Sequence, residues 1–480
     1  MRGLQLRSIL YFWSCFCISS IYGTQSDHDI LPTIDISLCD AKIEYSIRFI
    51  CYNAIDSAMR EFGTFVAVGH GIEPSFFKEA YNNAKTLFSI DIDNKLNVSM
   101  SYFKNDFGRG YIPFGQEAGV ATYFEIKEGY SYGFPRKENS HENSQEDIHM
   151  KSHKRNPMES LNIWPSNLED STILALESVY TEKTRVVKII LEAIISVQKV
   201  RDKELGTANG LVAALTSTST STLTSTAALA TTAENDVNKV VEEEVEEEVD
   251  IVNVSSDGDT ISLMRLFHYF SSESILESKL EPKSKLESQS DISHDDQKTQ
   301  KSDQKIQKST EKTKVNIGSS PHTDWGLLTL ILQDNIGGLQ FYHNNIWKDV
   351  PIVEYGLVVN GGDYLNLISE GIYHSPIHRV LCPPQGKERL SYVFFYYPGF
   401  YSKISMKNVR KNDQKEYVQV EGGYNTFLEI NSNGDTTEKH EKKLKKGTEI
   451  QDTNRETVKT DILTFGDYIL RKWRGVEVVS

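Results

Sequence analysis

The stretch that decides the fold is HTDWGLLTL, which runs from His322 to Leu330. It places a histidine and a carboxylate two positions apart, and the Leu- and Thr-rich run that follows is typical of a β-strand. Side chains two positions apart on a strand lie on the same face, so His322 and Asp324 can reach one metal ion. A second histidine, His378, follows further along the chain. Two imidazoles and one carboxylate predict a non-haem iron site with open positions for a co-substrate and dioxygen.

A second polar pair, Arg389 and Ser391, opens the strand-like run RLSYVFF at residues 389–395. These two residues are again two positions apart, and a guanidinium fork beside a hydroxyl is a good clamp for a carboxylate. A predicted strand at residues 356–360 and a GGD turn at residues 361–363 separate the two histidines. This order is consistent with a sheet that folds back over itself.

Residues 321–398 resemble the iron(II)- and 2-oxoglutarate-dependent dioxygenases of the isopenicillin N synthase-like family. That family shares, in order, H-T-D-x-G-x-L-T, Q-D-x-x-G-G-L-Q, W-x-x-V, G-D, H-R-V and R-x-S. The chain has QDNIGGLQ at residues 333–340, WKDV at residues 347–350, and each later element in the same order. The N-terminal words LPTIDI and EFGTF, at residues 31–36 and 61–65, are also similar to the family's opening strands.

The resemblance implies a role for six side chains. Those expected to bind Fe(II) are His322, Asp324 and His378. Those expected to hold the distal carboxylate of 2-oxoglutarate are Arg389, Ser391 and Tyr269. No catalytic residue is expected beyond the metal centre.

At Tyr269 the chain departs from the family pattern. The family usually has a proline after this tyrosine and often an asparagine two positions before it, whereas the chain has Phe270 and Phe267. The assignment of Tyr269 therefore rests on position alone.

The resemblance also implies an activity. The expected enzyme is an oxidoreductase that hydroxylates or desaturates a small organic substrate and releases succinate and CO2 from 2-oxoglutarate. Fe(II) would be its cofactor, 2-oxoglutarate and dioxygen its co-substrates, and ascorbate a further candidate cofactor. Ring closure is equally compatible with the pattern. Two alternatives stay open: an iron oxidase of the same fold that does not use 2-oxoglutarate, and a catalytically inactive binding protein.

Hydrophobic periodicity predicts helices early in the chain and strands late. Apolar residues recur at helical spacing in residues 47–58, 76–88 and 171–203. We therefore predict an α+β protein, a double-stranded β-helix (jelly roll) core flanked by helices, with long disordered insertions. The predicted parts are a mostly helical N-terminal region at 31–205, a catalytic region at 260–400, and a C-terminal extension at 401–480 with a polar insert and a closing helix.

Two polar segments interrupt this plan. Residues 206–259 contain a Thr/Ser/Ala tract followed by Glu-rich repeats, and residues 271–315 are highly charged with scarcely any aromatics. Neither contains enough apolar surface to offset chain entropy, so we expect both to be disordered or loosely helical. The second lies between Tyr269 and His322, but each doubling of a flexible loop costs only about 0.6 kcal/mol. It is therefore compatible with an intact site.

Charge and composition narrow the classes of molecule that the protein is expected to bind. About half of the net charge of −15 comes from residues 234–250, which contain nine acidic residues and one lysine. Acidity thus says little about the substrate, while the lack of a sustained Lys/Arg patch argues against nucleic-acid binding. We expect a monomer that acts on a small molecule.

The N-terminus leaves the compartment open. Arg2 and Arg7 precede an apolar run at residues 9–21, so residues 1–23 are either a signal peptide or an N-terminal extension. The protein would enter the secretory pathway in the first case and be cytoplasmic in the second. No other apolar run is long enough to span a bilayer. The five cysteines are scattered, so we expect no disulfide framework.

Overall fold

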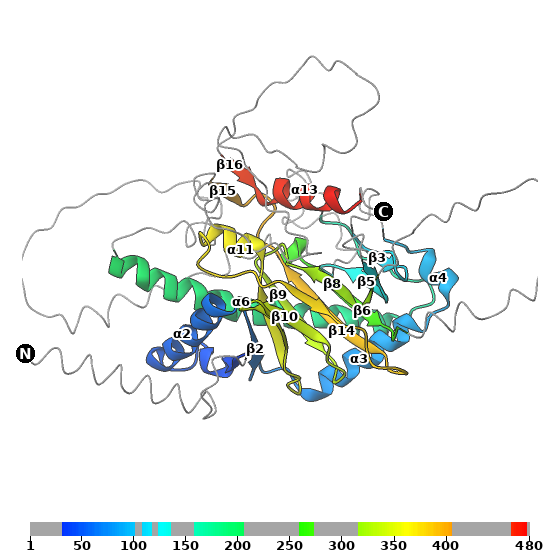
Figure 1. Ribbon diagram of the computed structural model, residues 1–480, viewed down its shortest axis with the longest axis horizontal. Helices are drawn as coiled ribbons and strands as arrows, with labels where there is room; N and C mark the ends of the chain where they lie inside the picture. Colours follow the sequence, from blue (N-terminus) through cyan, green and yellow to red (C-terminus); the bar gives the residue numbers. More distant parts are fainter. Residues whose placement is uncertain are drawn as a thin grey trace, which may run out of the picture.

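The protein is represented by a computed structural model, which describes residues 31–100, 108–117, 123–135, 158–205, 259–272, 315–405 and 462–477. Helices and two principal sheets make up this part of the chain (Figure 1). The helices are η1 (Ile36–Cys39), α2 (Tyr45–Glu61), α3 (Pro74–Phe88), α4 (Ile92–Leu96), α6 (Asp170–Leu205), α11 (Asp363–Ile368) and α13 (Phe465–Glu477). Both predicted insertions lie almost entirely outside the described residues, as do the predicted signal peptide and the C-terminal polar insert.

The larger sheet has eight strands in the order β1-β2-β12-β9-β14-β6-β5-β3. Its neighbours are antiparallel except for the parallel pair β1 and β2. The strands are β1 (Thr33–Asp35), β2 (Thr64–Val68), β12 (Leu357–Gly361), β9 (Leu328–Gln333), β14 (Arg389–Tyr396), β6 (Leu263–Tyr269), β5 (Lys127–Tyr132) and β3 (Gly110–Ile112).

The smaller sheet has four strands in the order β11-β10-β13-β8. They are β11 (Ile346–Asp349), β10 (Leu339–His343), β13 (His378–Val380) and β8 (Ser319–His322). Two further strand pairs complete the described part, namely β4 (Tyr123–Glu125) with β7 (Val315–Ile317), and β15 (Lys403–Ser405) with β16 (Ile462–Thr464). The predicted mixture of helices and sheets is confirmed.

The larger sheet buries both of its faces. On β9, Leu330 and Leu332 pack into the core shared with the helices, whereas Ile331 belongs to a second apolar cluster with Phe341 and Val380 of the smaller sheet. This alternation is what strand geometry requires of a sheet covered on two sides. The second cluster fills the space between the two sheets, and the candidate site lies beside it.

The long helix α6 covers the outer face of the larger sheet and contacts β9 and β14 (Figure 1). Its predicted apolar stripe is confirmed, because Val186, Ile190 and Ile194 are fully buried. Lys183 of the same helix is also buried and donates hydrogen bonds to the carbonyl oxygens of Leu330 and Tyr392, at 3.0 and 2.6 Å. Burial lowers the pKa of Lys183 well below its ordinary value. The lysine thus joins the helix to the two central strands.

Within the described residues, two of the scattered cysteines form a disulfide, whereas their spacing predicted no disulfide framework. Cys39 and Cys51 are bonded, with 5.6 Å between their Cα atoms. They are twelve positions apart, at the end of η1 and within α2, so the contact arises from the packing of α2 against η1 rather than from a spacing pattern. Cys382 is a free thiol.

A bilayer-crossing helix is not found within the described residues, because none of their helices combines enough length with enough hydropathy. The longest, α6, carries charged residues along its whole length.

Asp56 of α2 contacts side chains of other segments, and its substitution tests how much these contacts stabilise the fold. Its buried carboxylate accepts hydrogen bonds from Arg60 Nε at 3.0 Å, Arg201 Nη2 at 2.6 Å and the Tyr373 hydroxyl at 2.8 Å. Removing one partner of a buried ion pair costs about 3–5 kcal/mol, so Asp56→Ala should lower the free energy of unfolding by about 3 kcal/mol. Urea unfolding followed by circular dichroism measures this, with the exposed Glu79→Ala as the control, expected to change it by less than about 0.5 kcal/mol. Equal effects of the two substitutions would contradict the prediction.

Candidate metal centre

Three of the predicted side chains converge between the two sheets. His322 ends β8 and His378 begins β13, and the two residues are direct partners in the antiparallel pairing of these strands. The Nε2 atom of His322 lies 3.9 Å from Asp324 Oδ1, and that of His378 lies 3.7 Å from Asp324 Oδ2. One nitrogen or oxygen from each of the three residues lies within 4.8 Å of the others, so a single ion can contact all of them.

Asp324 reaches this point from a turn and not from a strand. The two-residue spacing predicted a strand that carries both His322 and Asp324, but β8 ends at His322 and β9 begins only at Leu328. The turn is held from behind, because the backbone N–H of Asp363 donates to the Asp324 carbonyl at 2.7 Å. A Cβ at Gly362 would lie 2.1 Å from the carbonyl oxygen of Gly326, so the predicted GGD turn needs glycine there.

The hydrogen bonds made by the Nδ1 atoms of the two histidines fix the tautomers of their rings. Nδ1 of His322 lies 2.7 Å from the Ser320 carbonyl, and Nδ1 of His378 lies 3.0 Å from the Pro376 carbonyl. A carbonyl can only accept, so each Nδ1 carries the proton and donates it, which leaves the Nε2 lone pairs facing Asp324. Burial and the neighbouring imidazole of His378 lower the pKa of His322 below its ordinary value, which keeps that ring neutral as a metal ligand must be.

The donor set fits a cation. Asp324 Oδ2 is buried and has no hydrogen-bond partner among the described residues. The two oxygens of this carboxylate each face the Nε2 lone pair of one histidine, so acceptor atoms lie opposite acceptor atoms with no proton between them. Buried polar atoms are rarely left in this state, and a divalent ion would satisfy all three at once.

The cluster opens into a cavity of about 160 Å³ whose walls also carry the predicted carboxylate clamp. Arg389 is 1% exposed, and its Nη2 donates a long hydrogen bond of 3.3 Å to Gln333 Oε1. Its Nε and Nη1 atoms and the hydroxyl of Ser391 have no hydrogen-bond partner within the described part of the chain. These buried donors fit a carboxylate, which would accept from both residues.

Tyr269 lies beside this clamp. It is the direct partner of Arg389 in the pairing of β6 with β14, and its ring centroid lies 4.8 Å from the guanidinium carbon. The stacked ring limits the positions open to the guanidinium and directs its fork into the cavity. The structure therefore brings all six predicted side chains to one cavity, in two groups.

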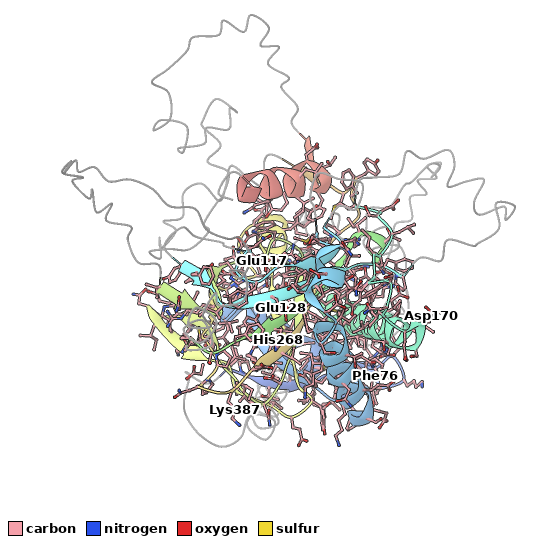
Figure 2. The ribbon with its side chains drawn as sticks, turned by 90° about the vertical axis from the view of Figure 1, so that its right-hand side faces the viewer. Phe76, Glu117, Glu128, Asp170, His268 and Lys387 are labelled. Atoms are coloured by element: carbon pink, nitrogen blue, oxygen red, sulfur yellow. A yellow bond between two sulfur atoms is a disulfide. The ribbon has the colours of Figure 1, made fainter. Side chains whose placement is uncertain are left out.

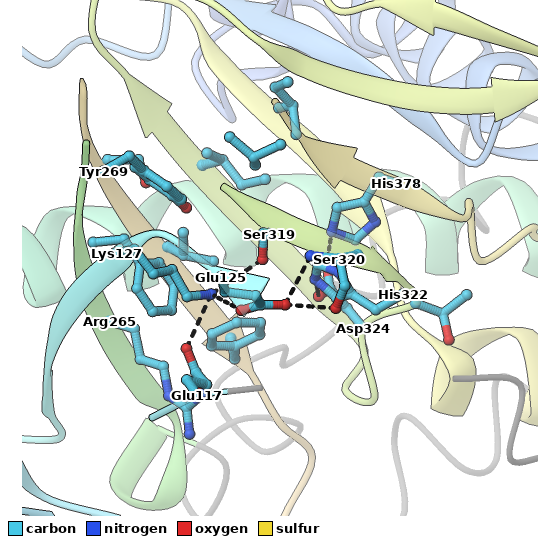
Figure 3. A pocket seen from close by; sticks show the side chains of 18 of the residues that line it. Glu117, Glu125, Lys127, Arg265, Tyr269, Ser319, Ser320, His322, Asp324 and His378 are labelled. Atoms are coloured by element: carbon cyan, nitrogen blue, oxygen red, sulfur yellow. Dashed lines mark hydrogen bonds and ion pairs between the residues drawn. The ribbon is translucent and has the colours of Figure 1, made fainter. Parts of the chain in front are cut away.

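A row of four charged side chains in the same cavity escaped the sequence analysis. Lys127 Nζ lies 2.8 Å from Glu125 Oε2 and 3.1 Å from Glu117 Oε2, and Arg265 is paired with Glu117 Oε1 (Figure 3). Arg265 is 148 positions from Glu117, which no local pattern could connect.

In this row, oppositely charged neighbours shift the pKa values of Glu117 and Lys127 toward their charged forms. Burial alone would raise the pKa of Glu117, but Lys127 and Arg265 outweigh it and hold that pKa below its ordinary value. Burial alone would lower the pKa of Lys127, but Glu125 and Glu117 raise it above its ordinary value. Glu117 and Lys127 are therefore both charged at neutral pH.

His70, His268 and His374 are among the described histidines that lie outside the cavity. His70 is a buried turn residue with Nε2 2.8 Å from the Tyr355 carbonyl. His374 is exposed. His268 faces away from the cavity that Tyr269 lines and lies 3.0 Å from Glu128, beside which it is seen in Figure 2. It is a structural residue and not a contact of this site.

Comparisons with known proteins agree with this arrangement. Residues 299–398 match the 2OG-Fe(II) oxygenase superfamily, and residues 31–167 match the family described as non-haem dioxygenase in morphine synthesis N-terminal. The first match contains the three clustered residues and both Arg389 and Ser391.

Individual proteins similar to this chain agree with these two family matches. A Dictyostelium discoideum protein named as a probable iron/ascorbate oxidoreductase is 26% identical over 373 residues, which are 78% of this chain and 82% of that protein. The Arabidopsis thaliana 1-aminocyclopropane-1-carboxylate oxidase homolog 5 is 46% identical over 77 residues, only 16% of this chain and 19% of that protein. A solved 2OG-Fe(II) oxygenase family protein from Caulobacter crescentus has the same fold, with a TM-score of 0.50 at 16% identity over 93% of this chain and 99% of that one.

Substituting Asp324 tests the metal cluster. Asp324→Ala removes its only anionic ligand and should weaken Mn(II) binding by more than about 100-fold, since loss of even an outer partner costs about 10–100-fold. Isothermal titration calorimetry with Mn(II), which resists oxidation, measures the affinity. The control is His374→Ala, four positions from His378, which should bind Mn(II) as the unaltered protein does. Unchanged affinity in Asp324→Ala would show that the ion binds elsewhere.

Proposed function

The chain belongs to the 2OG-Fe(II) oxygenase superfamily, and from that premise we propose that it hydroxylates or desaturates a small organic molecule and releases succinate and CO2. One observation carries the proposal. A single cavity presents three acceptor atoms without a donor at one point, and buried donors without an acceptor at another. A divalent cation together with a dicarboxylate that reaches from it to the arginine satisfies both.

The proposal includes the finer architecture. The two sheets that enclose the cavity support a double-stranded β-helix, in which strands far apart in sequence become neighbours. Here β6 lies between β5 and β14, which come from quite different parts of the chain. We assign the catalytic region to residues 260–400, with the helical region at 31–205 packed around it.

Each residue then has a distinct task. His322, Asp324 and His378 would hold Fe(II), while Arg389 and Ser391, supported by Tyr269, would hold the distal carboxylate of 2-oxoglutarate. When bound, the metal and co-substrate supply the activation of dioxygen and the oxidising power for an unreactive C–H bond. The similarity to a protein named for iron and ascorbate supports ascorbate as the accessory reductant.

Apolar side chains in the cavity wall help to exclude water. Ile331, Leu339, Val380 and Val393 are among the residues that line it. Low polarity strengthens the attraction between Arg389 and a carboxylate, because little solvent screens the charges. It also protects reactive species from side reactions, which is the part of the chemistry that the protein itself controls.

The proposed reaction is tested by stoichiometry. The protein loaded with Fe(II) is incubated with 2-oxoglutarate, ascorbate and fractionated small-molecule extracts, and succinate is measured against 2-oxoglutarate by mass spectrometry. Equal amounts of succinate formed and 2-oxoglutarate consumed are expected, increased by the fraction that holds the substrate. Oxygen consumption without succinate would favour an oxidase that uses another small acid, and an inactive protein that binds iron would favour a binding role.

The carboxylate clamp gives a graded prediction. Arg389→Gln removes charge-assisted hydrogen bonds worth about 1.5–3 kcal/mol, so the KM for 2-oxoglutarate should rise by about 10–150-fold. Ser391→Ala removes one neutral hydrogen bond worth about 1 kcal/mol, so the rise should be about 5-fold. Succinate formation without primary substrate measures both.

Arg379→Gln is the matched control for this series. Arg379 is an arginine on β13 whose guanidinium carbon lies 4.1 Å from the Trp347 ring centroid, and it does not line the cavity. Its substitution should leave the KM unchanged. If all three substitutions raised the KM equally, Arg389 and Ser391 would not be the clamp.

A further inference from the structure

The row of charged side chains in the cavity is not used by the proposed reaction. Four groups of alternating sign follow one another in the order Arg265, Glu117, Lys127 and Glu125 (Figure 3). All four line the same cavity as the metal cluster. Burying charged side chains is costly even when they are paired with one another. A row of four in this cavity therefore calls for a functional explanation, such as binding a charged group of the substrate.

The two cations are held rigidly. Lys127 lies on β5 and Arg265 on β6, which are paired strands of the larger sheet. Lys127 Nζ also donates to Ser319 Oγ at 3.1 Å and lies 4.3 Å from the Phe267 ring centroid. Glu125, which pairs with Lys127, is itself fixed, because it accepts a hydrogen bond of 2.7 Å from the backbone N–H of Ser320.

Glu117 differs from the other three in how it is held. It follows β3 in a turn segment whose backbone hydrogen bonds are Gly115 N to Lys127 O, at 3.0 Å, and Gln116 N to Pro113 O, at 3.1 Å. Its side chain is 19% exposed, against 12% for Arg265, 5% for Lys127 and 4% for Glu125. Glu117 is therefore the member of the row that can leave at the lowest cost.

The contacts of Glu117 are those of a bound ligand. Its Oε1 is paired with Arg265 and its Oε2 with Lys127, so one carboxylate bridges two cations from adjacent strands. This is a two-point site for a carboxylate, and any molecule with that group could reproduce both contacts. We propose that Arg265 and Lys127 form an anion subsite, that Glu117 fills it in the state described, and that the primary substrate carries a carboxylate which replaces Glu117.

Charge balance favours an anionic occupant that displaces Glu117. Counted by formal charge, the acidic and basic residues that line the cavity carry three positive charges, on Lys127, Arg265 and Arg389, and three negative ones, on Glu117, Glu125 and Asp324. A divalent metal and the dianion 2-oxoglutarate add no net charge. A substrate carboxylate entering beside Glu117 would leave one buried negative charge uncompensated, whereas its exchange for Glu117 keeps the cavity neutral.

The other charge classes fit less well. A cationic group would have to displace Lys127 or Arg265, which the sheet holds in place, from Glu117. A neutral substrate would leave the bridge intact and would have no use for the second cation. The inference rests on the proposed function for the identity of the reaction, but the subsite can be tested by binding alone.

The test compares an acid with its neutral isostere. Phenylacetate and phenylacetamide are titrated by calorimetry into protein loaded with Mn(II) and saturated with 2-oxoglutarate, so that Arg389 is already occupied. Glu117→Gln keeps the shape of the side chain and removes the competing charge, and it should bind phenylacetate at least about 10-fold more tightly than the unaltered protein, in keeping with the 1.4 kcal/mol that a tenfold change represents. Its affinity for phenylacetamide should not change.

Two further variants complete the design. Adding Arg265→Gln to Glu117→Gln should abolish the gain, while circular dichroism verifies that the double variant is folded. Glu388→Gln, an exposed glutamate that pairs with His268 outside the cavity, should leave phenylacetate affinity unchanged. Equal affinity of Glu117→Gln for acid and amide, or a gain that survives loss of Arg265, would overturn the inference. Succinate formation by a protein without acid preference would leave the proposed function standing, and failure to bind Mn(II) and 2-oxoglutarate would reject that function instead.

Discussion

The pairing of β8 with β13 is the constraint on which the rest of the site depends. It sets His322 opposite His378, and it does so with the lone pairs of both rings aimed at the same carboxylate. Without an ion these atoms gain nothing from their proximity, so the sheet and the bond from Asp363 to the Asp324 turn must hold them there. Such locally unfavourable arrangements persist only where the surrounding structure determines them, and they are characteristic of functional sites.

The two sheets carry different groups of the side chains that line the candidate site. The smaller sheet contributes the histidines, whereas the larger sheet contributes Arg389, Ser391 and Tyr269 from two paired strands. Because each group belongs to a different sheet, the distance between metal and clamp is set by how the sheets pack. With the proposed roles, the apolar residues between the sheets, such as Ile331 and Val380, would determine the length of co-substrate that fits. Packing here is part of recognition.

Part of the fold and of the candidate site could be predicted from the sequence, and part could not. Hydrophobic periodicity predicted the α+β class, and the two-residue spacing within each polar pair drew attention to His322 with Asp324 and to Arg389 with Ser391. The roles expected of all six side chains, Tyr269 included, came from the resemblance to a known family. The helices around residues 47–58, 76–88 and 171–203 were found from hydrophobic periodicity, since periodicity reports burial. The break between β8 and β9 was missed because a turn can present His322 and Asp324 together as well as a strand can.

What was missed depends on contacts between distant segments. Glu117, Lys127 and Arg265 meet only after β5 and β6 pair, and Cys39 meets Cys51 only when α2 packs on η1. The disulfide has a consequence for redox balance. A disulfide persists where thiols are oxidised, while a non-haem iron enzyme must keep its metal divalent, so the two make opposite demands on the same surroundings. A one-electron donor that reduces ferric ion but attacks disulfides slowly reconciles them, and the near-complete burial of both sulfur-bearing residues, at 1% and 3% exposure, shields the bond from thiol exchange.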